Sequence, residues 1–132
     1  MKQLTLDLFP LYNAVMLTAQ SRQKLIETFG DGVHERFYGC HITTEFKPDS
    51  RPLDEGKDII IHVIGYAKDN NGEALVAYPE GVTCTNAIPH ITLSCAKGVS
   101  PVYSNDLLQK GFKFLEKPLI LRGILSSVFP KQ

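Results

Sequence analysis

The amino-acid sequence predicts an α+β fold that combines an antiparallel hairpin, several further strands and two short helices. Three observations predict it: runs rich in β-branched residues, one clear hairpin signal, and two segments with the spacing and end signals of helices. The chain has 132 residues, of which 43% are hydrophobic. That length and composition are typical of one domain with a proper core, so we expect residues 1–132 to form one domain.

The domain is expected to open with a strand followed by a helix. Residues 13–18 are a short apolar run, which is typical of a buried strand. Residues 21–30 then have apolar side chains at helical spacing, and Gly30 stands where a glycine would end the helix. The polar residues 31–36 are expected to form a loop.

A β-hairpin is the clearest element in the sequence. Residues 58–67 are rich in β-branched side chains, residues 69–72 give the Asn-Gly turn signal, and residues 73–78 return antiparallel. Prolines and mixed charges mark residues 47–57 as an exposed loop. Residues 79–88 are expected to form a second surface loop, a candidate rim or lid for a cleft.

Two elements are expected to follow in the last third of the chain. Residues 104–111 predict a short helix, with Ser104 as its cap and Gly111 as its stop. Residues 118–129 predict a strand with a bend at Gly123.

The charge balance argues against partners that are large polyanions. The chain has 14 basic and 14 acidic residues, so no overall field would draw it onto duplex DNA or an anionic membrane. A small nucleotide or an RNA end fits better. No apolar run approaches the ~20 residues that span a bilayer, and residues 1–7 do not read as a secretory signal. We therefore expect a cytoplasmic protein, in the host cytoplasm if the source is viral.

One tripeptide occurs twice, as His41-Ile42-Thr43 and as His90-Ile91-Thr92. Each copy lies in a run that predicts a strand, residues 40–46 and 89–95. Side chains alternate along a strand, so the histidine and threonine of each copy should share one face while the isoleucine points to the other. If the two strands lie side by side, two imidazoles and two hydroxyls meet in one cleft.

Such a cleft has the groups that phosphodiester cleavage requires. The reaction needs a base for the attacking oxygen, an acid for the departing oxygen, and donors for the phosphate oxygens. Histidine can act as acid or base near neutral pH, and threonine can donate. One His-x-Thr tripeptide is a common accident in strands. Two matched copies in strand context argue against accident.

The two tripeptides resemble the paired His-hydrophobic-Thr/Ser motifs of the 2H phosphoesterase superfamily, and Pro89 before the second copy adds to the likeness. The resemblance implies a bilobal α+β fold of antiparallel sheets with flanking helices and a pseudo-twofold axis. It implies catalysis without metal or cofactor, on cyclic phosphates or on 2′-5′ or 3′-5′ linkages. The chain looks most similar to the small RNA-repair-like and phage anti-CBASS nuclease branches. It departs from many members by its short spacing between the motifs and by its lack of tryptophan.

By the resemblance, His41 and His90 are the acid and base, and Thr43 and Thr92 are the phosphate donors. The sequence leaves open which histidine is the base. We prefer His90 as the group that activates water and His41 as the group that protonates the leaving oxygen.

Several neighbouring residues are candidates for weaker roles. Tyr12 could stack on a nucleobase, with packing as its alternative role, and Lys47 could steer a phosphate. Glu45 should continue the face of the motif histidine. Tyr38 should turn to the opposite face and pack there. Gly39 either leaves room for a ligand or bends the entrance of the strand.

The three cysteines, Cys40, Cys84 and Cys95, form no Cys-x-x-Cys pair. Reduced structural thiols are typical of that pattern. Strand alternation places Cys40 and Cys95 on the face opposite the histidines, so we expect both to fill the core.

A zinc site is the alternative chemical interpretation, with the motif histidines joined by Cys40, Cys84 or His62. Zinc usually takes three or four ligands, and Cys40 should face away from His41. No metal site is therefore predicted. His62 is interpreted as an ordinary strand histidine, and His34 as a solvated loop residue.

The sequence thus predicts a metal-independent phosphodiesterase of the 2H type. Its candidate substrates are a 2′,3′-cyclic phosphate, free or at an RNA end, and a cyclic oligonucleotide messenger of antiviral signalling. Two alternatives remain: a non-catalytic module that binds a nucleotide or RNA end, and a purely structural interaction protein. The sequence identifies no protein partner.

Overall fold

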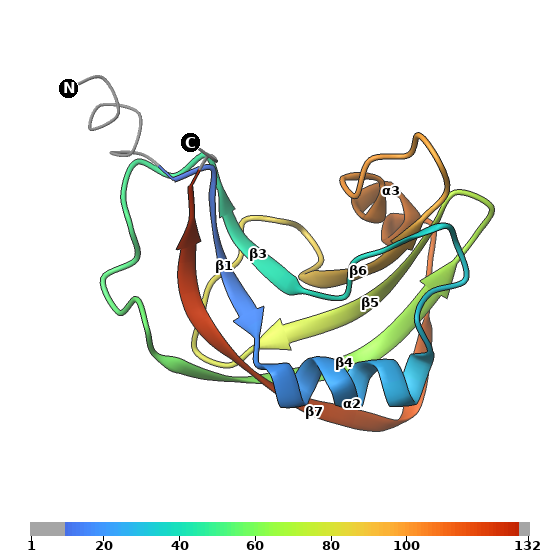
Figure 1. The fold of residues 1–132 in the computed structure, drawn as a ribbon, viewed down its shortest axis with the longest axis horizontal. Coiled ribbons are helices and arrows are strands. Elements are labelled where there is room, and N and C mark those ends of the chain that lie inside the picture. Colours follow the sequence, from blue (N-terminus) through green and yellow to red (C-terminus); the bar gives the residue numbers. More distant parts are fainter. Residues whose placement is uncertain (1–9, 130–132) are drawn as a thin grey trace.

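The structure is a computed structural model that describes residues 10–129. The predicted absence of a signal in residues 1–7 therefore concerns residues outside the described range. Seven strands and two helices are described (Figure 1): β1 (Tyr12–Leu17), α2 (Ala19–Phe29), β2 (Arg36–Phe37), β3 (His41–Phe46), β4 (Asp58–Lys68), β5 (Gly72–Pro79), β6 (His90–Cys95), α3 (Tyr103–Gln109) and β7 (Lys113–Val128).

All strand pairs are antiparallel, in the order β2-β6-β3-β1-β7-β4-β5. Because β5 also pairs with β6, the strands from β6 to β5 close into a ring. β2 and β3 pair with the same edge of β6, β3 at Ile91 and β2 further along at Ser94 and Cys95. The predicted antiparallel α+β architecture is confirmed.

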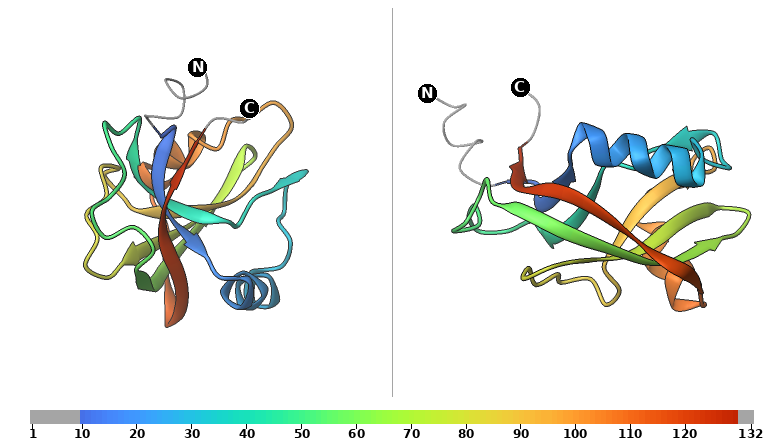
Figure 2. Two further views of the ribbon diagram at one scale, coloured as in Figure 1. Left: turned by 60° about the vertical axis from the view of Figure 1, so that its left-hand side comes forward. Right: turned by 90° about the horizontal axis from the view of Figure 1, so that it is seen from below.

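The sheet is bent into two lobes that share its longest strands. Figure 1 shows β1 and β3 on the left, and β5, β6 and α3 on the right. β4 has 11 residues and β7 has 16, so each is long enough to run through both lobes (Figure 2). The lobes are therefore parts of one continuous sheet.

The core lies inside the ring of strands. It contains one or more fully buried aliphatic side chains from each strand of the ring and from α2, among them Val15, Leu25, Ile42, Ile61, Leu75, Ile91 and Leu121. The central isoleucines of both tripeptides belong to this cluster, and both are 0% exposed. The apolar half of each motif is thereby fixed in the core.

Local signals explain where the main elements begin and end. The Thr18 hydroxyl accepts a hydrogen bond from the Ser21 amide at the start of α2, and Gly30 ends the helix at a φ of 84°. In the β4–β5 turn, one carboxylate oxygen of Asp69 accepts from the amides of Asn71 and Gly72, which is an Asx-type turn. The predicted end of the helix at Gly30 and the predicted turn at residues 69–72 are confirmed.

The structure differs from the sequence predictions at three elements. Arg36, the last residue of the predicted loop, instead forms the two-residue strand β2 with Phe37, paired with β6. β7 begins at Lys113 rather than at residue 118. Lys113 and Phe114 already pair with β4, and an irregularity of the register that includes Pro118 separates them from the regular pairing that starts at Leu119. α3 begins at Tyr103, and Ser104 is not its cap: the cap position is Val102, which makes no side-chain cap bond.

No helix among residues 10–129 is long and apolar enough to cross a membrane.

Gly123 lies where β7 passes close to β1, and it pairs in regular register with both β1 and β4. A Cβ atom there would lie 2.5 Å from Val15 Cγ1 and 2.8 Å from the Met16 carbonyl oxygen. We expect Gly123→Ala to lower the free energy of unfolding by about 1–3 kcal/mol, because overpacking forces neighbouring atoms to shift. Chemical denaturation measures this change. Arg122→Ala, at the exposed neighbouring position, is the control and should have little effect.

Candidate active site

The pairing of β3 with β6 brings the two tripeptides together. Ile42 is the direct partner of Ile91 in this antiparallel pair. His41 therefore lies opposite Thr92, and Thr43 lies opposite His90. All four polar side chains line one pocket of about 530 Å³, on the side of the sheet away from the buried isoleucines. The predicted convergence of two imidazoles and two hydroxyls on one cleft is present.

A hydrogen bond fixes the tautomer of the His90 ring. Its Nδ1 atom lies 2.8 Å from the carbonyl oxygen of Ile88. A carbonyl oxygen can only accept, so Nδ1 carries a proton and donates it. In the neutral ring Nε2 is then the atom with a free lone pair. This is the atom that could accept a proton from an attacking water.

The pKa values of both histidines are lowered. Burial lowers the pKa of His90, and the bond to the Ile88 carbonyl opposes this in part. Burial also lowers the pKa of His41, and the charge of a protonated His90 lowers it further. Both rings are therefore mainly neutral at pH 7. A phosphate anion beside them would raise both pKa values, because it stabilises the charged form.

Aromatic rings border the pocket beside His41. The ring of Tyr12 stacks on the His41 ring, with centroids 5.1 Å apart and planes 24° apart. Tyr12 thus lines the pocket and packs on the histidine at the same time. Burial, and to a lesser extent the charge of Cys40, raise the pKa of its hydroxyl, which keeps the phenol protonated at neutral pH.

A β-bulge in β3 changes which side chain follows Thr43 on the pocket side. Asn13 pairs with Glu45 while Ala14 pairs with Thr43, so Thr44 is the extra residue. Phe46 consequently lines the pocket, and Glu45 lines a different hollow of the surface. The prediction that Glu45 continues the motif face is wrong, because simple alternation does not hold across the bulge.

Tyr38 and Cys40 were expected on the opposite face, and both line the pocket. Gly39 between them adopts a φ of 60°, a left-handed conformation that breaks the alternation of an extended strand. The regular strand β3 starts only at His41. The bend at Gly39 is confirmed, whereas core filling by Cys40 is wrong. Cys95 is buried as predicted, at 1% exposure.

The remaining sequence candidates lie outside the lining of this pocket. Lys47 is exposed, and its ammonium group lies 5.8 Å from the centroid of the Phe46 ring. Its role in phosphate binding stays a prediction. His62 pairs with Glu80, with Nε2 and Oε2 2.6 Å apart, as suits an ordinary strand histidine. His34 is not simply solvated, because its Nε2 lies 2.8 Å from the Asp69 carbonyl oxygen.

Sequence reasoning missed several residues around the pocket. Asn86 lines it from the loop that was predicted as a rim, so that prediction is confirmed. Pro101 and Val102 line it from the turn before α3, and Asn105 lines it from α3 itself. Only the tertiary packing of α3 brings them there, and no local pattern indicates it.

Among residues 10–129, no three His, Cys, Asp or Glu side chains are grouped so that they could hold a metal ion.

Comparison with known families identifies the domain. The family described as the fungal tRNA ligase phosphodiesterase domain matches residues 54–123, which is more than half of the chain. The chain belongs to this family. The matched segment runs from just before β4 into β7 and includes the second tripeptide with His90 and Thr92. This phosphodiesterase domain is of the 2H phosphoesterase type, so the predicted superfamily is confirmed. No curated protein matches the chain.

The coupling between the two imidazoles can be measured directly. We expect His90→Asn to raise the pKa of His41, because the charge that lowers it is removed, while burial still holds it below 6.5. An NMR titration of the His41 ring protons checks this. His62→Asn is the matched control, since His62 contacts Glu80 outside the pocket. An unchanged His41 pKa in His90→Asn would contradict a shared site.

Proposed function

We propose that the protein hydrolyses a 2′,3′-cyclic phosphate at an RNA end. The observation that carries the proposal is the convergence of His41, Thr43, His90 and Thr92 in one pocket. Membership of the tRNA ligase phosphodiesterase family supports an RNA end as the substrate. The equal numbers of basic and acidic residues fit a short end rather than a long duplex.

In the proposed reaction, His90 Nε2 takes a proton from water, and the water oxygen forms a new bond to phosphorus. The bond from phosphorus to one ribose oxygen breaks, and protonated His41 delivers a proton to that oxygen. The cyclic phosphate is thereby opened to a phosphomonoester. The fixed Nδ1 proton of His90 suits this ring to act as the base.

The acid must be charged, although burial favours neutral imidazoles. The cyclic phosphate supplies the compensation, since its negative charge raises the pKa of His41 when it binds. The hydroxyls of Thr43 and Thr92 would donate to the non-bridging oxygens, where charge develops in the transition state. The proposed mechanism needs no metal ion or cofactor.

Alanine substitution of the paired histidines tests the proposal. An RNA oligonucleotide that ends in a 2′,3′-cyclic phosphate is incubated with the protein in EDTA. We expect His41→Ala and His90→Ala each to lower kcat by on the order of 10²- to 10⁴-fold, the usual contribution of a general acid or base. His62→Ala should retain activity, because that side chain lies outside the pocket.

The same assay separates the alternatives. A non-catalytic binding module would bind the RNA end but form no product. Full turnover by either histidine variant would reject the assigned pair of catalytic histidines. Activity that appears only with added zinc would favour the metal interpretation. Cyclic dinucleotides in the substrate panel test the antiviral messenger prediction. A cytoplasmic location stays a prediction.

A further inference from the structure

Ser104, on the first turn of α3, reaches the second tripeptide. It is 2% exposed, and its Oγ lies 2.8 Å from Thr92 Oγ1. Thr92 Oγ1 also lies 3.4 Å from the carbonyl oxygen of Pro101. A hydroxyl that the sequence predicts as a helix cap is therefore bonded to a threonine of the paired motifs.

These contacts are consistent with one arrangement of the two hydroxyl protons. A hydroxyl has one proton and can accept through its lone pairs. The Pro101 carbonyl can only accept, so the contact between them uses the proton of Thr92. In the arrangement in which Thr92 donates to Pro101, the proton in the 2.8 Å bond comes from Ser104. Ser104 then donates to Thr92, and Thr92 donates onward.

The bond from Thr92 to Pro101 is the weak link of this chain. At 3.4 Å it exceeds the usual range of an O–H···O hydrogen bond. A phosphate oxygen in the pocket would be a stronger acceptor, because a charged acceptor makes a shorter and stronger bond. The Thr92 proton could turn to the phosphate without any change in the bond from Ser104.

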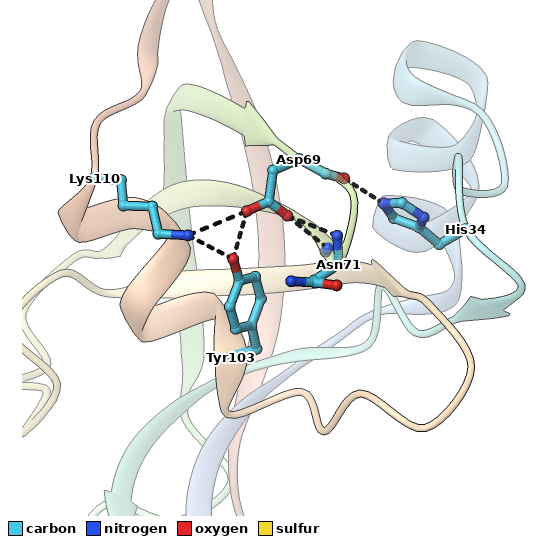
Figure 3. A network of polar contacts seen from close by, with 6 residues as sticks. His34, Asp69, Asn71, Tyr103 and Lys110 are labelled. Carbon is cyan, nitrogen blue, oxygen red and sulfur yellow. Dashed lines mark hydrogen bonds and ion pairs between the residues drawn. The ribbon is translucent and has the colours of Figure 1, made fainter.

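A network of polar contacts holds α3, and with it Ser104, against the β4–β5 turn (Figure 3). The Tyr103 hydroxyl donates to the Asp69 carboxylate, and the Lys110 ammonium group donates to the Tyr103 oxygen at 2.8 Å. Burial alone would raise the pKa of Asp69, but bonds from Tyr103, the turn amides and Lys110 lower it to about 2. The carboxylate is therefore ionised at neutral pH, where it can accept the bonds from Tyr103 and Lys110.

We propose that Ser104 is a positioning residue that orients the Thr92 hydroxyl toward the substrate phosphate. The inference rests on the proposed function, because it assigns Thr92 as a phosphate donor. By donating to Thr92 Oγ1, Ser104 occupies a lone pair and leaves the Thr92 proton free to point into the pocket. A chain of two hydroxyls also polarises the terminal O–H, which strengthens its bond to an anion.

A double-mutant cycle tests the proposal. We expect Ser104→Ala to lower kcat about 5- to 30-fold, as for the loss of one hydrogen bond that strengthens in the transition state. In a Thr92→Val background the same substitution should change kcat less than about twofold, since its target is gone. In a Thr43→Val background it should keep its full effect. A role in the packing of α3 alone would give the same loss in all three backgrounds and would overturn the proposal.

Ser100→Ala is the matched control. Ser100 precedes α3, and its hydroxyl accepts from the Val102 amide instead of contacting Thr92. We expect its kcat to stay near that of the wild type. Ser104→Cys fills the same space with a weaker donor and should be intermediate in kcat. If Ser104→Ala does not fold, Ser104→Cys replaces it as the test variant. Wild-type kcat in Ser104→Cys would then overturn the proposal.

The affinity for inorganic phosphate, measured by calorimetry, gives a readout that does not depend on turnover. Ser104→Ala should weaken phosphate binding in the wild-type and Thr43→Val backgrounds but not in Thr92→Val. If the wild type binds phosphate in this pattern yet cleaves no cyclic phosphate, the proposed function fails and the role of Ser104 stands. If Ser104→Ala alters neither kcat nor phosphate affinity, the role of Ser104 is overturned and the proposed function stands.

Discussion

The pairing of Ile42 with Ile91 is the constraint on which the site depends. Both side chains are fully buried in the core, so each fixes the register of its own strand. A slip of one residue would expose an isoleucine and turn a histidine and a threonine into the core, which carries a large free-energy cost. The hydrophobic effect therefore sets the geometry of the polar groups, and no direct bond between the two motifs is needed. The long strands β4 and β7 hold the two lobes in one sheet and keep this pairing in place.

The electrostatics of the pocket favour two neutral imidazoles, whereas acid–base catalysis requires one of them to be charged. Burial lowers both pKa values, and the charge of a protonated His90 lowers the pKa of His41 further. In the proposed mechanism, an anionic substrate opposes this preference when it binds, because its charge raises both pKa values. The charged acid would then exist mainly when there is a phosphate to cleave, while the Ile88 carbonyl keeps the other ring in the tautomer of a base.

The sequence predicts those parts of the fold that depend on local chemistry. The capped end of α2 at Gly30, the Asp69 turn and the strands around both tripeptides follow from short-range patterns and are confirmed. The same alternation rule fails at Tyr38 and Cys40, because one left-handed glycine precedes the strand. Ser104 shows a second limit: its local pattern indicates a helix cap, but its partner Thr92 is reached only through tertiary packing. Local rules thus locate the motifs, whereas the shape of the cleft depends on irregular backbone and on contacts between distant segments.

The bulge at Thr44 has a consequence for the charge of the ligand. If β3 continued in regular pairing through Thr44, strand alternation would direct the Glu45 carboxylate into the pocket beside the motif side chains, where it would repel an anionic ligand. The insertion gives that place to the ring of Phe46, which can lie against the flat surface of a nucleobase. The bulge thus keeps a carboxylate out of the pocket and places an aromatic ring there.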